Sequence, residues 1–143
     1  MLSVFVILSM YFGGSFDWSF EDFPVYDCEP FERVAKLSRD SLPDNSYIME
    51  AFDAQWKRGE NNFACHYYVL SYGCGRQCQM NLIFDQRTGK CIRSLITSSG
   101  VAYRENSRIL VAFIGASRAD KKEYYIIEND QLRRFEAFDR SRR

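Results

Sequence analysis

The sequence lacks three features that mark large classes of proteins: an excess of charge of one sign, a long hydrophobic run and an internal repeat. Lysine plus arginine and aspartate plus glutamate each number 19. No net charge therefore directs the chain to nucleic acid or to a membrane surface, and we expect no nucleic-acid partner. The longest apolar run covers 11 residues, 2–12, whereas a membrane-spanning helix needs about 20, so we expect no stable membrane span. No segment recurs at the period of about 20 to 50 residues that is typical of repeat architectures.

Aromatic residues, in contrast, are abundant. They make up 16% of the chain, from 12 Phe, 9 Tyr and 2 Trp, and this composition favours β structure. The shares of hydrophobic residues, 46%, and charged residues, 27%, are those of an ordinary globular protein and exclude a disordered tail or a coiled coil. A length of 143 residues suits one domain. We therefore expect a single α+β domain over residues 16–143.

The first 15 residues have two interpretations. The apolar run is followed by Gly13, Gly14 and Ser15, as in a secretory signal with small residues at its cleavage site, but no basic residue precedes the run. The segment is either an atypical signal or a buried N-terminal segment. The first interpretation predicts a periplasmic or otherwise exported protein. The second, in which residues 1–15 are part of the fold, predicts a cytoplasmic one.

One helix is expected, over residues 46–58. Capping side chains precede its apolar positions, at Asp44, Asn45 and Ser46. The apolar side chains recur every four residues, at Ile48, Phe52 and Trp56, which predicts one buried stripe ending near Gly59.

The rest of the chain favours strands. Alternation of Phe16, Trp18 and Phe20 with polar residues predicts a short strand or an extended edge, and residues 34–37 could form one more strand. From residue 63 onward, β-branched and aromatic runs are separated by turn residues; they cover residues 63–72, 79–84, 90–96, 107–114, 123–128 and 131–138. Their short connections, such as Asn129-Asp130, join antiparallel neighbours. We predict an antiparallel β meander of about five to seven strands with one packed helix.

Residues 61–91 hold four of the five cysteines and the only histidine. Four motifs follow in order: NFACHY at 62–67, GCGRQCQ at 73–79, FDQRTGK at 84–90 and YRENSRIL at 103–110. With EDFPV at 21–25, this set resembles a family of small exported bacterial proteins of uncharacterised function, whose usual forms are NFAGHY, WGCGxxCQ, DxxTG and YRxDSRLL. The resemblance implies an exported α+β domain and brings no established activity. This chain departs from the family pattern at Cys65, Tyr72 and Asn106, where glycine, tryptophan and aspartate are usual.

The cysteines allow several disulfide pairings. Cys74 and Cys78 lie four positions apart across a glycine-containing turn, so a local bridge between them is possible in an oxidising compartment. Cys65 and Cys91 flank the same predicted hairpin and could form a second bridge, which would leave Cys28 over. Sequence alone does not choose among the pairings, and reduced thiols in a cytosolic protein are the alternative.

No metal or other cofactor is expected. Cys65, His66, Cys74, Cys78 and Cys91 offer nitrogen and sulfur ligands. However, neighbours in a strand project to opposite faces, so Cys65 and His66 would not share one site. The spacing also differs from the paired C-x2-C of common zinc sites.

Nucleophilic catalysis would need a thiolate beside an oriented base, and Cys74 with His66 and Asp85 is the candidate set. The competing interpretation is a histidine packed and hydrogen-bonded within an aromatic-rich core, which we favour.

Two candidate binding features remain. Gly73 and Gly75, with Arg76 alongside, could form a backbone nest for an anion, although a turn that needs positive φ is the more common use of such glycines. Arg108 is either a surface charge at a strand end or the partner of a buried carboxylate such as Asp85. The Asp85, Thr88 and Gly89 pattern is typical of a hairpin turn.

These observations favour a non-enzymatic exported module that binds another protein, in the manner of an inhibitor or immunity protein. Aromatic side chains at a surface make strong recognition anchors, and no catalytic signature competes with this interpretation. The alternatives are a cysteine-dependent hydrolase or thiol redox protein using Cys74 and His66, and a structural component of the cell envelope.

Overall fold

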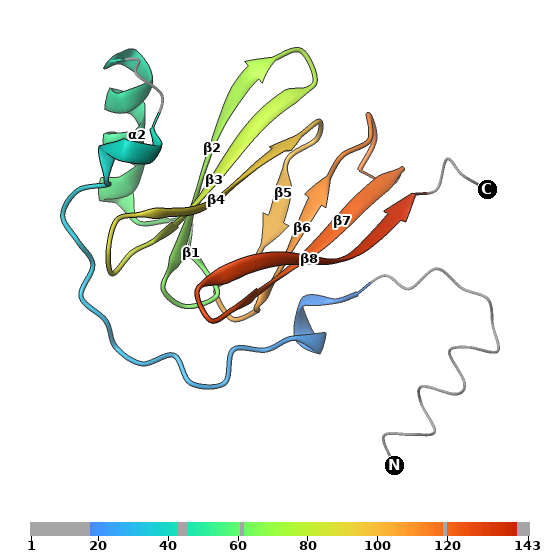
Figure 1. The fold of residues 1–143 in the computed structure, drawn as a ribbon, viewed down its shortest axis with the longest axis horizontal. Helices are drawn as coiled ribbons and strands as arrows, with labels where there is room; N and C mark the ends of the chain where they lie inside the picture. Colours follow the sequence, from blue (N-terminus) through green and yellow to red (C-terminus); the bar gives the residue numbers. More distant parts are fainter. Residues whose placement is uncertain (1–17, 43–45, 61, 119, 140–143) are drawn as a thin grey trace.

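The computed structural model describes residues 18–42, 46–60, 62–118 and 120–139 (Figure 1). The interpretations of residues 1–15 and of the capping residues Asp44 and Asn45 lie outside these ranges, as does Phe16. The helical elements are η1 (Phe20–Asp22), η2 (Arg39–Ser41) and α2 (Ser46–Arg58). The strands are β1 (Asn62–Phe63), β2 (Tyr67–Gly75), β3 (Cys78–Asp85), β4 (Cys91–Thr97), β5 (Val101–Tyr103), β6 (Ile109–Phe113), β7 (Lys121–Glu128) and β8 (Gln131–Asp139).

The strands form two antiparallel sheets of four strands, with the orders β1-β2-β3-β4 and β5-β6-β7-β8. The α+β class, the antiparallel pairing and the helix are thus confirmed, and the predicted count of about five to seven strands is close to the eight strands of the described residues. The strands, however, divide into two sheets instead of following one another in one meander. The division falls after β4, where Gly100 has a left-handed φ of +87°. There, the amides of Ser98 and Ser99 donate to the carbonyl of Phe113 at 3.2 and 3.0 Å, which turns the chain into the second sheet.

The expected strand over residues 63–72 is interrupted. Ala64 and Cys65 have φ of +46° and +77°, so the chain makes a tight left-handed turn between β1 and β2. The amides of these two residues donate to the carbonyls of Arg104 and Glu105 at 3.1 and 2.8 Å. The turn is therefore held by carbonyls about 40 positions away along the chain. No glycine or proline at the turn indicates its position in the sequence.

Helix α2 covers the outer face of the first sheet, as expected. Phe52 and Trp56 are each 1% exposed, and the helix gives way to Gly59 at a φ of +67°. The side chains beneath the helix come from the even-numbered positions of β2 and β3: Tyr68, Leu70, Leu82 and Phe84. Ile48 has no described side chain.

The main core lies between the sheets. The first sheet contributes Phe63, Tyr67, Val69, Ile83 and Leu95, and the second contributes Leu110, Ala112, Tyr125, Ile127 and Leu132. The central part of the first sheet is therefore buried on both faces. Much of the aromatic content lies in these cores, because the largest fully buried side chains in them include Trp56, Tyr68, Phe52, Phe63 and Phe84.

The N-terminal part of the domain wraps around the two sheets (Figure 1). Trp18 and Phe20 pack on the outer face of the second sheet. The chain then runs as an extended segment, residues 23–38, which we call the strap, to reach α2. The expected strands at residues 16–20 and 34–37 are wrong over the described residues, which form η1 and irregular backbone there. None of the described helices has the length and apolarity needed to cross a membrane.

Candidate functional site

Two disulfides cross-link the domain, and they are typical of a chain that folds in an oxidising compartment. Cys74 is bonded to Cys78, as expected. The Cys65–Cys91 bridge that the sequence allowed does not form, because Cys65 is bonded to Cys28 of the strap. The left-handed turn places Cys65 outside the continuous strand that a pairing with Cys91 would require. Cys91 is the one free thiol; it donates to the carbonyl of Arg93 at 3.3 Å, and burial raises its pKa.

The Cys74–Cys78 bridge closes the end of the β2–β3 hairpin, residues 73–78, which we call the tip. Gly75 pairs with Cys78, so that only Arg76 and Gln77 form the turn. Gly75 has a φ of +130° and Gln77 one of +52°, which confirms the turn that needs positive φ. Residues 73–77 are all exposed, and the tip projects past the ends of the other strands (Figure 1). The anion nest at Gly73 and Gly75 stays a prediction.

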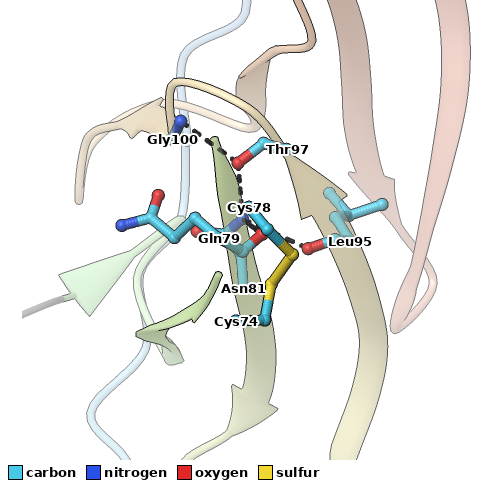
Figure 2. Close-up of a disulfide and its surroundings, with 7 residues drawn as sticks. All are labelled: Cys74, Cys78, Gln79, Asn81, Leu95, Thr97 and Gly100. Carbon is cyan, nitrogen blue, oxygen red and sulfur yellow. Dashed lines mark hydrogen bonds between the residues drawn. A yellow bond between two sulfur atoms is a disulfide. The ribbon is translucent and has the colours of Figure 1, made fainter. Parts of the chain in front are cut away.

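A buried amide braces the base of the tip (Figure 2). Asn81 is fully buried, and its Nδ2 donates to the carbonyl of Leu95 at 3.1 Å and to Oγ1 of Thr97 at 3.0 Å. Its Oδ1 accepts a hydrogen bond from Ser71 at 2.7 Å, and Thr97 Oγ1 also accepts from the amide of Gly100 at 3.1 Å. These bonds tie β2, β3, β4 and the turn after β4 together just below the disulfide.

The candidate catalytic set is not assembled. Cys74 is consumed in a disulfide at the tip, whereas His66 precedes β2 at the opposite end of the hairpin, where Tyr67 pairs with Asp85. Eight positions of extended chain separate Cys74 from His66, or about 26 Å at the rise of a strand. No thiolate therefore lies beside the histidine.

His66 instead belongs to a polar cluster with Asp85, Asp130, Arg87 and Tyr67. Its Nε2 lies 3.7 Å from Oδ1 of Asp130. Arg87 Nη2 bridges the two carboxylates, at 2.9 Å from Asp85 Oδ2 and 2.6 Å from Asp130 Oδ1, and the Tyr67 hydroxyl donates to Asp130. The cluster joins the turn after β3 to the β7–β8 hairpin.

The protonation states in this cluster follow from those contacts. The hydrogen bond from Tyr67 lowers the pKa of Asp130, with Arg87 acting in the same direction. Burial, followed by the charge of Arg87, lowers the pKa of His66 below its usual 6.5. Burial and Asp130 together raise the pKa of Tyr67. The imidazole is therefore neutral at neutral pH, and Asp130 is ionised.

The same cluster is the place where a metal ion could be sought. His66, Asp85 and Asp130 each offer a ligand atom, and these atoms lie within 4.8 Å of one another. Arg87 already bridges both carboxylates, so the chain supplies its own cation at this point. The contacts of the cluster are those of a structural network. The ring of His66 packs against the ring of Tyr67, as favoured from the sequence, but its Nε2 has no hydrogen-bond partner, so the expected hydrogen bonding is absent at this described atom.

Arg108 does not pair with Asp85. Its Nη1 lies 3.5 Å from Glu128 Oε1, and its Nε donates to the carbonyl of Pro24 at 3.3 Å. It lines a small pocket of about 170 Å³ between the strap, the turn at Ala64 and the β7–β8 hairpin. His66 lines the same pocket.

Sequence reasoning missed Arg87 and Asp130. A signal existed for the position of Asp130, because Asn129-Asp130 was expected to form a two-residue hairpin turn. Both residues do have left-handed φ, +51° and +59°. The turn formed by Asp85, Thr88 and Gly89 is also confirmed, since the Gly89 amide donates to the Asp85 carbonyl at 2.8 Å. Neither turn contains a sequence pattern that predicts the contact between Arg87 and Asp130.

The fold and its cross-links define a disulfide-bonded α+β domain of two antiparallel sheets, with a braced and exposed hairpin tip. Comparison with family models, with curated proteins and with solved structures found no match for this chain.

Proposed function

We propose that this protein is an exported, non-enzymatic module of the inhibitor or immunity type that binds a partner protein through its tip. The observation that carries the proposal is the position of the Cys74–Cys78 bridge, at the exposed end of a hairpin and away from the cores. The two disulfides support an oxidising compartment, and the periplasm is our specific proposal.

The tip disulfide contributes more to local rigidity than to the fold. In the chain-entropy picture, a bridge over a sequence separation of 4 stabilises by about 2 kcal/mol, against about 4 kcal/mol for the separation of 37 between Cys28 and Cys65. The β2–β3 ladder already holds most of the short loop. A bridge placed there mainly removes conformational freedom from exposed backbone. A surface that is rigid before it binds loses less entropy on binding.

The surroundings of the tip suit recognition. Arg76 is exposed at its apex, and arginine is enriched among the residues that dominate binding energy. Tyr72, Met80 and Ile96 lie in register across β2, β3 and β4, next to the tip. Ile96 is 63% exposed, so an apolar row extends the surface of the tip onto the sheet.

The test is a crosslinked pull-down from periplasmic extract with four forms of the protein. The wild type and Lys90→Ala, which alters an exposed charge at the opposite end of the sheet, should retain the same partner. Arg76→Ala and the double variant Cys74→Ser/Cys78→Ser should lose about tenfold or more in affinity for that partner while unfolding cooperatively. A partner bound equally by all four forms would place recognition elsewhere, and repeated failure to recover any partner would count against a binding module.

The same exposed disulfide supports a second candidate, a thiol redox protein acting through Cys74 and Cys78. This function predicts rapid exchange with glutathione at the tip and catalysis of disulfide exchange in a substrate protein. It gives His66 no part, because the histidine lies at the other end of the hairpin. Exchange at the tip no faster than in an unstructured peptide of the same sequence would remove this candidate.

A further inference from the structure

The strap is firmly attached at two places and weakly attached between them. The Val25 amide donates to the Asn106 carbonyl at 3.0 Å. At the other end, Arg33 donates to Oε1 of Gln86 at 2.8 Å and stacks over Trp56 at 3.8 Å. Between these points, residues 26–32 make no backbone hydrogen bond to either sheet within the described part of the chain.

The Cys28–Cys65 disulfide is the one covalent attachment of that stretch. Cys28 is exposed, whereas Cys65 is 4% exposed in the turn between β1 and β2. A second contact is weak: the ring of Phe31 meets the ring of His66 edge-on, at 5.9 Å between centroids. The disulfide is therefore the main restraint that holds residues 26–32 against the rest of the domain.

The turn that carries Cys65 is strained. Ala64 and Cys65 both adopt left-handed φ, a conformation that costs energy for residues other than glycine. The disulfide fixes Cys65 in that conformation from one side, and the carbonyls of Arg104 and Glu105 fix it from the other. Breaking the disulfide removes one of these two restraints.

A small pocket lies beside this stretch, with Asp27 in its wall. It has a volume of about 170 Å³, and Asp27 and Cys65 line it together with His66, Arg108 and Glu128. The Nε2 atom of His66 is buried without a hydrogen-bond partner. A buried polar atom left unpaired is unfavourable, and water reaching it after the strap opened would relieve that cost.

We propose that the Cys28–Cys65 disulfide is a redox-controlled latch: its reduction by a dithiol releases residues 26–32 and uncovers the His66 pocket while the two sheets stay folded. A thiolate of the dithiol attacks Sγ of Cys28, the exposed sulfur. The S–S bond breaks, and Cys65 leaves as a thiolate that takes up a proton. The second thiol of the reductant then displaces Cys28 from the mixed disulfide, so the reductant is oxidised to a disulfide as both cysteines become thiols.

The sheets have independent support. The core between them contains no side chain from residues 26–32. Beyond the latch, the Trp56 indole still donates to the Val34 carbonyl at 3.1 Å. Before it, Ser107 Oγ still donates to the carbonyl of Phe20 at 2.7 Å. Opening is thus confined to the stretch between the two attachments. It involves neither cysteine of the tip, so it is independent of the proposed binding function.

The experiment uses the full chain with Cys74→Ser, Cys78→Ser and Cys91→Ser, which leaves the latch as the one cysteine pair. Chymotrypsin cleavage after Tyr26 and Phe31, and modification of His66 by diethyl pyrocarbonate, are followed by mass spectrometry with and without dithiothreitol. Both should rise about tenfold or more on reduction, because each tracks the population of the open form. The reduced protein should still unfold in one cooperative thermal transition.

Two further variants in the same background keep the result interpretable. Cys28→Ser should be open with or without dithiothreitol. Cys65→Gly should be open too, since it lacks the disulfide. It should also fold, because glycine accepts a φ of +77° without strain. The latch proposal would be overturned if the oxidised and reduced proteins were equally protected from chymotrypsin and diethyl pyrocarbonate. Equal protection of Cys65→Gly and the oxidised protein would overturn it too. Loss of the cooperative transition on reduction would do so as well, since the bridge would then hold the fold itself.

Discussion

Arg87 and Asp130 are 43 positions apart in the sequence, yet Nη2 of the arginine lies 2.6 Å from Oδ1 of the aspartate. The contact joins the turn after β3, in the first sheet, to the β7–β8 turn, in the second. The same Nη2 also meets Asp85, whose side chain is 6% exposed. One guanidinium therefore compensates a buried carboxylate and links the ends of both sheets, next to the histidine that sequence reasoning had considered for catalysis.

Removing this guanidinium should destabilise the domain. Arg87→Ala leaves Asp85 buried without its cation, although the Arg87 backbone amide continues to donate to it. Because Arg87 is itself 41% exposed, solvent screening reduces the effect, and we expect a loss of about 1–2 kcal/mol in the free energy of unfolding. Urea denaturation measures this loss. Arg104→Ala, which breaks an ion pair with Glu21 at the surface, is the control and should cost less. Equal losses would show that the position of Arg87 between the carboxylates is unimportant.

Stability should depend on pH through His66, the only histidine. Its pKa is lowered in the folded protein, mainly by burial. As the pH falls past 6.5, the unfolded chain therefore takes up a proton before the folded chain does, and the free energy of unfolding decreases. The decrease should end once the pH is below the folded pKa. Urea denaturation from pH 8 to about 5 measures it. The variant His66→Asn should show a flatter profile over this range, and an unchanged profile would refute the assignment.

Position 65 should favour glycine over alanine. Both Cys65→Gly and Cys65→Ala remove the disulfide, but alanine must hold the left-handed φ of +77°. We expect the glycine variant to be more stable by about 1 kcal/mol, measured by thermal or urea unfolding. The opposite order is expected at Ala51, an exposed position in α2, where glycine should cost about 1 kcal/mol.

Two glycines provide a matched test of how the strap packs on the first sheet. A Cβ at Gly89 would lie 2.8 Å from the Lys36 carbonyl oxygen, and its φ is +74°, whereas a Cβ at Gly73 would meet nothing within 4 Å. Gly89→Ala should therefore destabilise by about 2 kcal/mol or more, and Gly73→Ala by less than about 0.5 kcal/mol. Similar losses for both variants would mean that neither the contact with the Lys36 carbonyl nor the left-handed φ constrains position 89.

Local features of the structure were largely predictable. The apolar stripe that includes Phe52 and Trp56 defines a helix by its own period, and Gly59 ends it. Alternation and short connections likewise locate most of the strands and their antiparallel pairing. The Cys74–Cys78 bridge was possible on local grounds, because four positions across a glycine-containing turn can bring the two sulfurs together, although the sequence left several pairings open. Each of these patterns is decided within about a dozen residues.

The remaining features depend on residues that are distant in sequence. The turn at Ala64 and Cys65 is held by the carbonyls of Arg104 and Glu105, so the run that contains it has the pattern of one continuous strand. That turn sends Cys65 to Cys28 and leaves Cys91 free.

By itself, the sequence determined the class of the domain, its one helix and most of its strands, and it offered the Cys74–Cys78 bridge at the tip as one of several possible pairings. Only the tertiary structure decided that the strands divide into two sheets, that the strap is latched at Cys65 and that His66 faces Asp130 rather than a thiol. The physical reason is that short-range patterns specify how a segment is shaped. The partner of a cysteine, a histidine or a buried carboxylate is selected instead by the packing of segments tens of residues apart.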